Sequence, residues 1–177
     1  MQAESEGQKR TTSVTFRISD QIYEAMQDHA RANKVSMNTL VNQLLGVWSE
    51  SDRFMDEVGL VRITRPNFTK FLEALPERKL AQVGRSAGKD LARSYMMANE
   101  GQVTVSGILN YVKGFAQYGG YAKYNETEND GKRVVVLVHN LGEAGSVYIG
   151  AYVQSLFELV GSRPTMTTTE RSVVVEL

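Results

Sequence analysis

The spacing of hydrophobic and polar positions changes three times within the first fifty residues. Apolar and polar side chains alternate over residues 13–18, and this period of two is typical of a short, half-buried strand. Ser19 then offers an N-cap and Asp20 an acidic first turn for a helix that should end near residues 33–34. Ser36 can cap a second helix, whose apolar face has steps of three and four and comprises Leu40, Val41, Leu44, Leu45 and Trp48.

Such a unit is too small to be stable alone. Fewer than about 45 residues bury too little apolar surface to offset chain entropy, and a single strand has no partner for its backbone groups. Both problems disappear if two chains pair their strands antiparallel and pack their helices together. The pattern over residues 11–52 therefore predicts a dimer.

The remainder of the chain predicts a larger domain of mixed α+β class. Residues 1–10 are polar and are expected to form a flexible tail, and residues 53–66 are expected to form a linker ending at Pro66. Residues 67–177 predict the order helix, helix, strand, strand, helix, strand.

Within this domain, Asn67 is expected to cap a short helix that Pro76 interrupts. A longer helix over residues 77–99 has an expected apolar face of Leu80, Val83, Ala87, Leu91, Tyr95 and Ala98. The next helix follows Thr104 and ends at Gly119-Gly120, and Asn129-Asp130-Gly131 is a strong hairpin signal. A helix over 143–160 and a strand-rich stretch over 165–176 complete the chain.

The segment SVTFRISDQIYEAMQDHARANKVSMNTLVNQLLGVWSE resembles the ribbon-helix-helix family of DNA-binding regulators over about forty residues (11–50). The specific features are the alternating strand ending in Ser19, the helix that opens on Asp20, and the Val35-Ser36-Met37-Asn38 entry to the second helix. The resemblance implies an intertwined dimer that inserts a two-stranded antiparallel ribbon into the DNA major groove.

The resemblance also implies roles for individual residues. The outward side chains of the ribbon, Ser13, Thr15 and Arg17, are expected to contact bases, and the alternative is a generic sheet edge that needs polar residues. The turn into the second helix is expected to clamp the DNA backbone, because a helix N-terminus attracts phosphate. The expected phosphate contacts are Lys9, Arg10, Lys34, Ser36, Met37 and Asn38.

The amino-acid composition excludes several classes of protein. The chain has no cysteine and 2 histidines, which excludes disulfide frameworks and thiolate metal sites and leaves no spacing for a metal centre. His29 is expected to be a solvated helix residue. No Ser-His-Asp arrangement or phosphate-binding loop is present, so we expect no enzymatic activity, no cofactor and no bound metal. No apolar run would span a bilayer, and the polar N-terminus differs from a signal peptide.

Two further features lie in the larger domain. Arg78, Arg85, Lys89 and Arg93 recur along one helix face, which is either a solvated face or a secondary basic surface for DNA or an acidic ligand. Residues 139–146 place two glycines near a helix N-terminus, which more often marks a tight strand-to-helix turn than an anion cradle.

Residues 83–177 also resemble, faintly, the vinyl-reductase-type domains that bind small molecules in some aromatic-compound-sensing regulators. The likeness rests on Gly84, Gly88, the run 118–121, the run 139–146 and the closing strand, whereas the paired cysteines of many such domains are missing, so no zinc is implied. An apolar sensor cavity is then expected, with lining candidates Tyr95, Tyr111, Phe115, Tyr148 and Tyr152, or these are ordinary core or interface aromatics.

Together these observations predict a dimeric, sequence-specific transcriptional regulator with a C-terminal oligomerisation or small-molecule-sensing domain. Its expected partners are double-stranded DNA, a second copy or a higher homo-oligomer, and a small-molecule effector, with no membrane. The expected location is the cytoplasm, associated with the nucleoid. The alternative is an antitoxin, or a plasmid-partition or architectural DNA-binding protein, whose C-terminal domain is purely structural.

Overall fold

The structure, a computed structural model, describes residues 11–53, 61–129 and 131–177. Contacts divide the chain into two compact units, Met1–Gly46 and Val47–Leu177, and each is described by itself. The sequence analysis placed the end of the first domain at residue 52. The short π-helix η1 (Trp48–Asp52) contacts helix α6 (Val105–Gly119) and lies in the second unit. The predicted tail over residues 1–10 lies outside the described residues, and so do residues 54–60 of the predicted linker.

The first unit contains two helices, as its sequence pattern predicted: α1 (Asp20–Ala32) and α2 (Met37–Val47). The Ser19 hydroxyl accepts a hydrogen bond from the Ile22 backbone N–H at 3.4 Å, and Ser36 accepts one from Thr39 at 3.0 Å. Both predicted N-caps are therefore confirmed.

The predicted strand over residues 13–18 is not formed in the single chain. Residues 11–19 have no regular secondary structure, and every strand of the described chain lies in the second unit. The physical reason is that a strand requires a hydrogen-bonded neighbour, and no segment of the described chain pairs with this one. Alternation of side chains alone therefore did not produce a ribbon.

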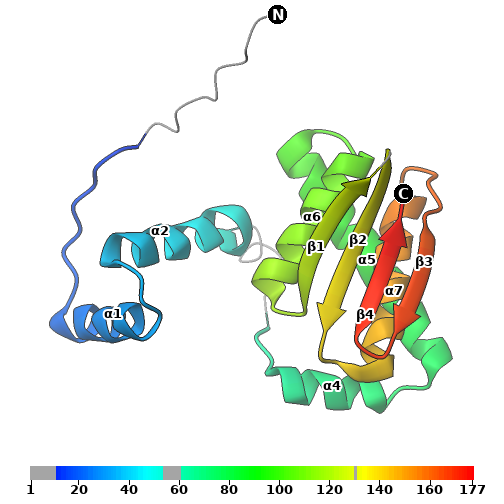
Figure 1. The fold of residues 1–177 in the computed structure, drawn as a ribbon, viewed down its shortest axis with the longest axis horizontal. Helices are drawn as coiled ribbons and strands as arrows, with labels where there is room; N and C mark the ends of the chain where they lie inside the picture. The colour runs from blue at the N-terminus through cyan, green and yellow to red at the C-terminus, as the bar shows by residue number, and fades with distance from the viewer. Residues whose placement is uncertain (1–10, 54–60, 130) are drawn as a thin grey trace, which may run out of the picture. The chain divides into compact units, whose positions relative to one another are not determined.

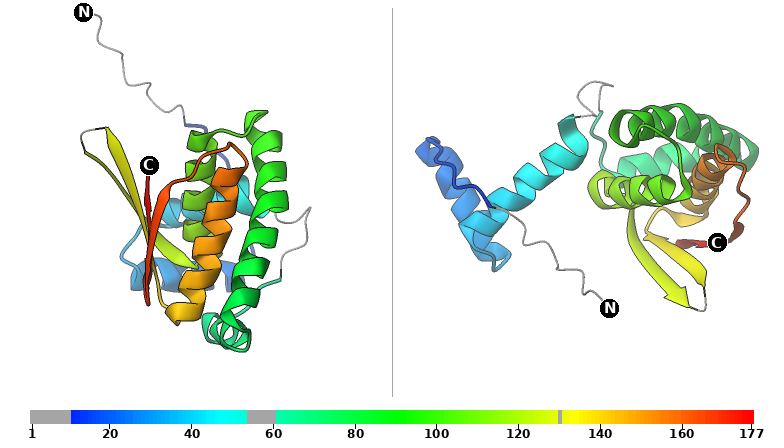
Figure 2. Two further views of the ribbon diagram at one scale, coloured as in Figure 1. Left: turned by 90° about the vertical axis from the view of Figure 1, so that its right-hand side faces the viewer. Right: turned by 90° about the horizontal axis from the view of Figure 1, so that it is seen from above.

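The second unit is an α+β fold in which helices cover one face of an antiparallel sheet (Figures 1 and 2). Its helices are α4 (Arg65–Glu73), α5 (Glu77–Glu100), α6 (Val105–Gly119) and α7 (Gly142–Glu158). Its strands are β1 (Ala122–Asn129), β2 (Lys132–His139), β3 (Thr165–Thr169) and β4 (Ser172–Glu176), in the spatial order β1-β2-β4-β3. The mixed α+β class predicted from the sequence is confirmed.

The core lies between the sheet and the helices. Alternate residues of the two central strands are buried, among them Leu137 of β2 and Val173 of β4, which pair directly. They meet fully buried side chains of the helices, such as Phe157 of α7 and Ile108 of α6. Figure 2 shows α7 next to the sheet and α5 on the far side of α7.

Helix α5 approaches α7 closely at two glycines. A Cβ atom placed on Gly84 would lie 2.6 Å from the Tyr148 carbonyl oxygen, and one on Gly88 would lie 2.8 Å from that of Tyr152. The buried face of α5 therefore follows the glycine positions, whereas Val83 of the predicted face is 46% exposed. The predicted apolar face was wrong for much of its length, because backbones that approach this closely need small residues at the contact.

The predicted element order also needs one correction at its end. After α7 the chain forms a hairpin of two short strands, β3 and β4, where the sequence analysis expected one. The run of β3 is almost entirely threonine, so it lacks the apolar alternation that would mark a second strand. The earlier hairpin is confirmed, since β1 pairs with β2 around Gly131, which has a φ of 74°.

Candidate functional site

The residues expected to contact bases are all exposed in the single chain. Ser13, Thr15 and Arg17 lie in the segment that precedes α1, and each is accessible to solvent. The intervening apolar residues are exposed as well, with Val14 at 64% and Phe16 at 61% of their maximal accessibility. Neither face of this segment is therefore covered by the described chain.

The turn between α1 and α2 has a defined geometry. Lys34 has a φ of 55°, in the left-handed region that lets the chain reverse after α1, and the Val35 N–H donates to the Ala30 carbonyl at 3.0 Å. The next residues open α2: Ser36 and Asn38 are exposed and Met37 is half-buried. Lys34 and the first N–H groups of α2 thus lie on one turn. Lys9 and Arg10, the other expected phosphate contacts, lie outside the described residues.

The two helices of the first unit share an apolar groove. Its lining includes Ile22 and Met26 of α1 and Leu40 and Leu44 of α2. Ile22 and Leu44 remain 52% and 53% exposed, and Leu40 is one of only two buried apolar residues among the described residues of this unit. His29 is exposed on the rim of this groove. The unit thus exposes a continuous apolar surface on a very small core.

The expected basic face of α5 is interrupted by an ion pair. Lys89 contacts Glu158 of α7 at 2.7 Å, and its hydrogen bond is the main reason that the pKa of Glu158 lies below its usual value. Arg78, Arg85 and Arg93 are exposed. The four cations therefore do not act alike, because one of them joins α5 to α7.

A buried histidine and serine lie at the start of α7. The Leu141 N–H donates to His139 Nδ1 at 3.3 Å, so the proton of the neutral ring is assigned to Nε2, which is 3.0 Å from Ser146 Oγ. Ser146 in turn donates to the Thr169 carbonyl oxygen. Burial lowers the pKa of His139, which keeps the ring neutral. In this arrangement the ring cannot accept the Ser146 proton, so the network anchors the strand-to-helix turn to β3 and does not prepare a nucleophile.

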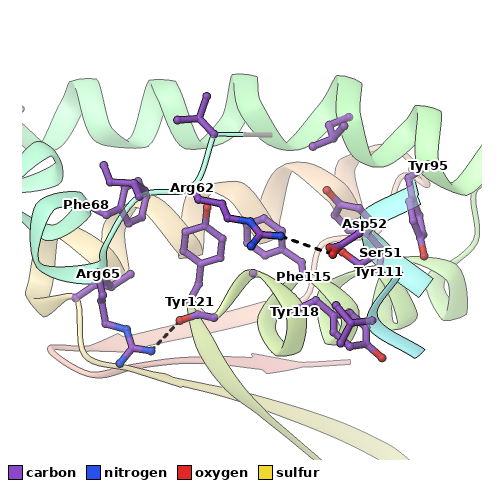
Figure 3. A pocket seen from close by; sticks show the side chains of 18 residues that line it. Ser51, Asp52, Arg62, Arg65, Phe68, Tyr95, Tyr111, Phe115, Tyr118 and Tyr121 are labelled. Carbon is purple, nitrogen blue, oxygen red and sulfur yellow. Dashed lines mark hydrogen bonds and ion pairs between the residues drawn. The ribbon is translucent and has the colours of Figure 1, made fainter. Parts of the chain in front are cut away.

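The second unit contains a pocket of about 620 Å³ with an aromatic floor. The Phe115 ring stacks on Tyr121 with a centroid distance of 4.7 Å, and on Tyr152 at 4.9 Å. Phe68 of α4 meets the Tyr121 ring edge-on at 5.3 Å. Figure 3 shows the Phe115 and Tyr121 rings close to Arg62, with Phe68 to one side.

The polar ends of the deepest tyrosines are satisfied by each other. The hydroxyls of Tyr111 and Tyr152 are 2.7 Å apart, and both residues are 3% exposed. Burial raises the pKa of Tyr111 to about 12 and raises that of Tyr152 as well. Both phenols therefore stay neutral at ordinary pH, and one internal hydrogen bond satisfies their hydroxyl groups.

The mouth of the pocket is charged. Arg62 forms an ion pair with Asp52 at 3.8 Å, and the Arg65 guanidinium donates to the Gly120 carbonyl at 3.0 Å (Figure 3). Asp52 is the last residue of η1, and Val47 and Ser51 also line the pocket. One side of the mouth is thus formed by the chain that directly follows α2.

The structure brings together some of the predicted lining residues. Tyr95, Tyr111 and Phe115 line the pocket, whereas Tyr148 and Tyr152 lie behind it in the same aromatic cluster. The charged mouth was not predicted from the sequence. The Tyr118-Gly119-Gly120-Tyr121 run was a usable signal for one wall, because all four residues line the pocket.

Two features are absent from the part of the chain that the structure describes. No helix of the described residues has the length and apolar character needed to cross a membrane. No group of three or more potential metal ligands occurs among these residues either. The chain matches no protein-family model and no curated protein, so its family is not established by similarity.

Proposed function

We propose that this protein is a dimeric, sequence-specific DNA-binding transcriptional regulator of the ribbon-helix-helix type, with a C-terminal sensing domain. One observation carries the proposal. Residues 13–18 alternate strictly between apolar and polar side chains, yet all of them are exposed in the single chain, directly before two capped helices. Such a segment has the side-chain pattern of a strand and lacks only its neighbour.

A second copy supplies that neighbour. Exposed Val14, Phe16 and Ile18 are each worth about 1.5–3 kcal/mol if fully buried, which gives a strong drive to cover them. Antiparallel pairing of two such segments places their apolar side chains on one face, against the exposed apolar surface of α1 and α2. The polar side chains then form the opposite face of a two-stranded ribbon.

That polar face has the chemistry of a base reader. A two-stranded ribbon fits the major groove of B-DNA, which is about 12 Å wide. Arg17 can donate two hydrogen bonds to guanine O6 and N7, and the hydroxyls of Ser13 and Thr15 can donate or accept. Lys34 and the N-terminus of α2, with Ser36, Met37 and Asn38, are suited to hold phosphates and fix the register, and Lys9 and Arg10 can add contacts from the N-terminal segment.

The second unit can serve oligomerisation or sensing. Its pocket of about 620 Å³ is within the range of small-molecule sites, about 300–1,000 Å³, and combines apolar walls with a few polar groups. A purely structural domain has no need for such a space. This observation favours sensing over a structural role.

The test is selection of bound fragments from the host genome with three proteins: the full chain, Thr15→Ala/Arg17→Ala, and Arg31→Ala. Arg31 is an exposed arginine of α1 outside the ribbon, so its variant controls for the loss of one positive charge. We expect a short repeated motif that the full chain and Arg31→Ala select and the double variant loses.

Other outcomes overturn the proposal in defined ways. Binding of fragments without a motif, equally by all three proteins, indicates an architectural DNA-binding protein. No retention of DNA at low salt, where phosphate contacts are strongest, refutes DNA binding as the function. A monomer in sedimentation at micromolar concentration refutes the shared ribbon.

A further inference from the structure

The pocket of the second unit combines three features that together specify a ligand and a means of response: an aromatic floor, a positively charged mouth, and a wall formed by η1. We infer that it binds a ring-containing small molecule that carries an acidic group, and that this ligand changes DNA affinity through the Asp52–Arg62 ion pair. The second half of the inference rests on the proposed function, and the first half does not.

The floor favours a flat, apolar group. Phe115 and Tyr121 are already stacked, with an angle of 12° between their planes, so the floor offers ring faces and edges rather than polar groups. The inner tyrosine hydroxyls are occupied by each other at 2.7 Å. A ligand that enters this space gains apolar contact without the need to satisfy those phenols.

The mouth favours a negative charge. Among the described residues that line the pocket, the charged ones are Asp52, Arg62 and Arg65, so cations outnumber the carboxylate by two to one. The Asp52–Arg62 pair is long, at 3.8 Å, and the Arg62 side chain is 84% exposed. Such a pair is weak and is readily exchanged for a carboxylate or sulfonate of a bound ligand, because a guanidinium binds such groups with two hydrogen bonds.

The same exchange has a consequence outside the pocket. Asp52 ends η1, and η1 directly follows α2, whose N-terminus is the proposed phosphate contact. A ligand that takes Arg62 from Asp52 removes one restraint on η1, while ligand contacts with Val47 and Ser51 add others. An arrangement of η1 with the ion pair intact and one with the ion pair exchanged differ in their affinity for the ligand, so the ligand shifts the equilibrium between them. If DNA also distinguishes these two arrangements, the ligand changes DNA affinity, and DNA changes ligand affinity by the same factor.

Two fluorescent probes with the same rings separate these contributions. The first is 1-anilinonaphthalene-8-sulfonate, an anion, and the second is N-phenyl-1-naphthylamine, its uncharged counterpart. Three variants of the full chain are compared with the unchanged protein: Arg62→Gln, Arg53→Gln and Gly114→Leu. Arg53 is exposed, follows η1 and does not line the pocket, so it is the matched control for charge.

Gly114→Leu blocks the space without disturbing the fold. Gly114 lines the pocket in the middle of α6, and a Cβ atom there meets only the Tyr118 ring, at 3.9 Å. Leucine also favours a helix more than glycine does, so the variant should fold at least as well as the unchanged protein. Near-ultraviolet circular dichroism of the tyrosine cluster verifies this.

We expect saturable binding of one probe molecule per chain, lost for both probes in Gly114→Leu. Arg62→Gln should weaken the anionic probe by up to about fivefold and leave the neutral probe unchanged, while Arg53→Gln should change neither. If Gly114→Leu binds both probes as tightly as the unchanged protein does, the pocket is not the binding site. If Arg62→Gln and Arg53→Gln weaken the anionic probe equally, Arg62 at the mouth does not bind the acidic group of the ligand.

The response is measured as the anisotropy of a labelled DNA fragment taken from the genomic selection. Saturating anionic probe should change the affinity for DNA, and it should change it less in Arg62→Gln. Probe binding with unchanged DNA affinity overturns the coupling. If the protein retains no DNA, the proposed function and the coupling both fail, while the probe titrations still decide whether the pocket takes an aromatic anion.

Discussion

The close approach of α5 and α7 makes one substitution especially informative, Gly84→Ala. The added Cβ atom would lie 2.6 Å from the Tyr148 carbonyl oxygen and 3.2 Å from the Ala151 Cβ atom. A carbon and a carbonyl oxygen normally approach to about 3.3 Å, so the helices must separate by about 0.7 Å at this point. The obstacle is backbone, which cannot rotate away as a side chain can.

The expected magnitude follows from two opposing contributions. Overpacking of this kind costs about 1–3 kcal/mol, and replacing a glycine inside a helix by alanine returns about 1 kcal/mol. We therefore expect Gly84→Ala to lower the free energy of unfolding by up to about 2 kcal/mol. The matched control is Gly114→Ala, where the new Cβ atom meets only an ordinary contact, so the same substitution should stabilise by up to about 1 kcal/mol.

The assay is urea denaturation of both variants, followed by the near-ultraviolet circular dichroism of the aromatic cluster in the second unit. The two variants should move the midpoint in opposite directions without a change in slope. If Gly84→Ala proves as stable as Gly114→Ala, the two helices do not pack through their glycines and the reasoning is refuted.

Three further predictions concern single residues. Arg17→Ala should reduce discrimination at one base pair by about 1–3 kcal/mol, measured by competition with substituted DNA sites, and unchanged selectivity would remove its role as a base reader. Burial lowers the pKa of His139 below its ordinary 6.5, so the unfolded chain binds a proton at this ring more readily than the folded chain does. The stability that the neutral ring provides is therefore complete above pH 6.5 and declines as the pH falls below that value. His139→Gln should flatten this part of the curve of stability against pH, measured by urea denaturation at several pH values. Lys89→Met should lower stability by less than about 1 kcal/mol at neutral pH, because the pair with Glu158 is partly exposed and methionine keeps the apolar stem. The difference should vanish in acid once Glu158 is protonated, and a larger loss at neutral pH would contradict the weak contribution expected of this ion pair.

Local signals in the sequence predicted local structure well. Ser19 and Ser36 mark the starts of α1 and α2 because an N-cap acts within one turn of its own helix. The hairpin at Gly131 could also be predicted from the sequence, because its turn needs a residue with left-handed backbone conformation at that position.

Features that depend on distant parts of the chain were harder to predict from the sequence. The buried face of α5 was misplaced because glycine counts as neither apolar nor polar in a periodicity argument, although Gly84 and Gly88 determine the contact with α7. The mouth of the pocket depends on Arg65 reaching Gly120, which lies 55 residues further along the chain. The segment over residues 13–18 differs again, because the proposed neighbour of its strand belongs to another molecule.

The strand order β1-β2-β4-β3 has a consequence for the solubility of the folded domain. The two strands richest in valine, β2 and β4, pair with each other in the middle of the sheet, where each has a paired strand on both sides. The outer positions belong to β1, which carries Lys123, Glu126 and Glu128, and to β3, which is short and rich in threonine. Charged or short edge strands discourage another chain from adding a strand to the sheet. The topology therefore keeps the valine-rich strands β2 and β4 from pairing with the same strands of other copies.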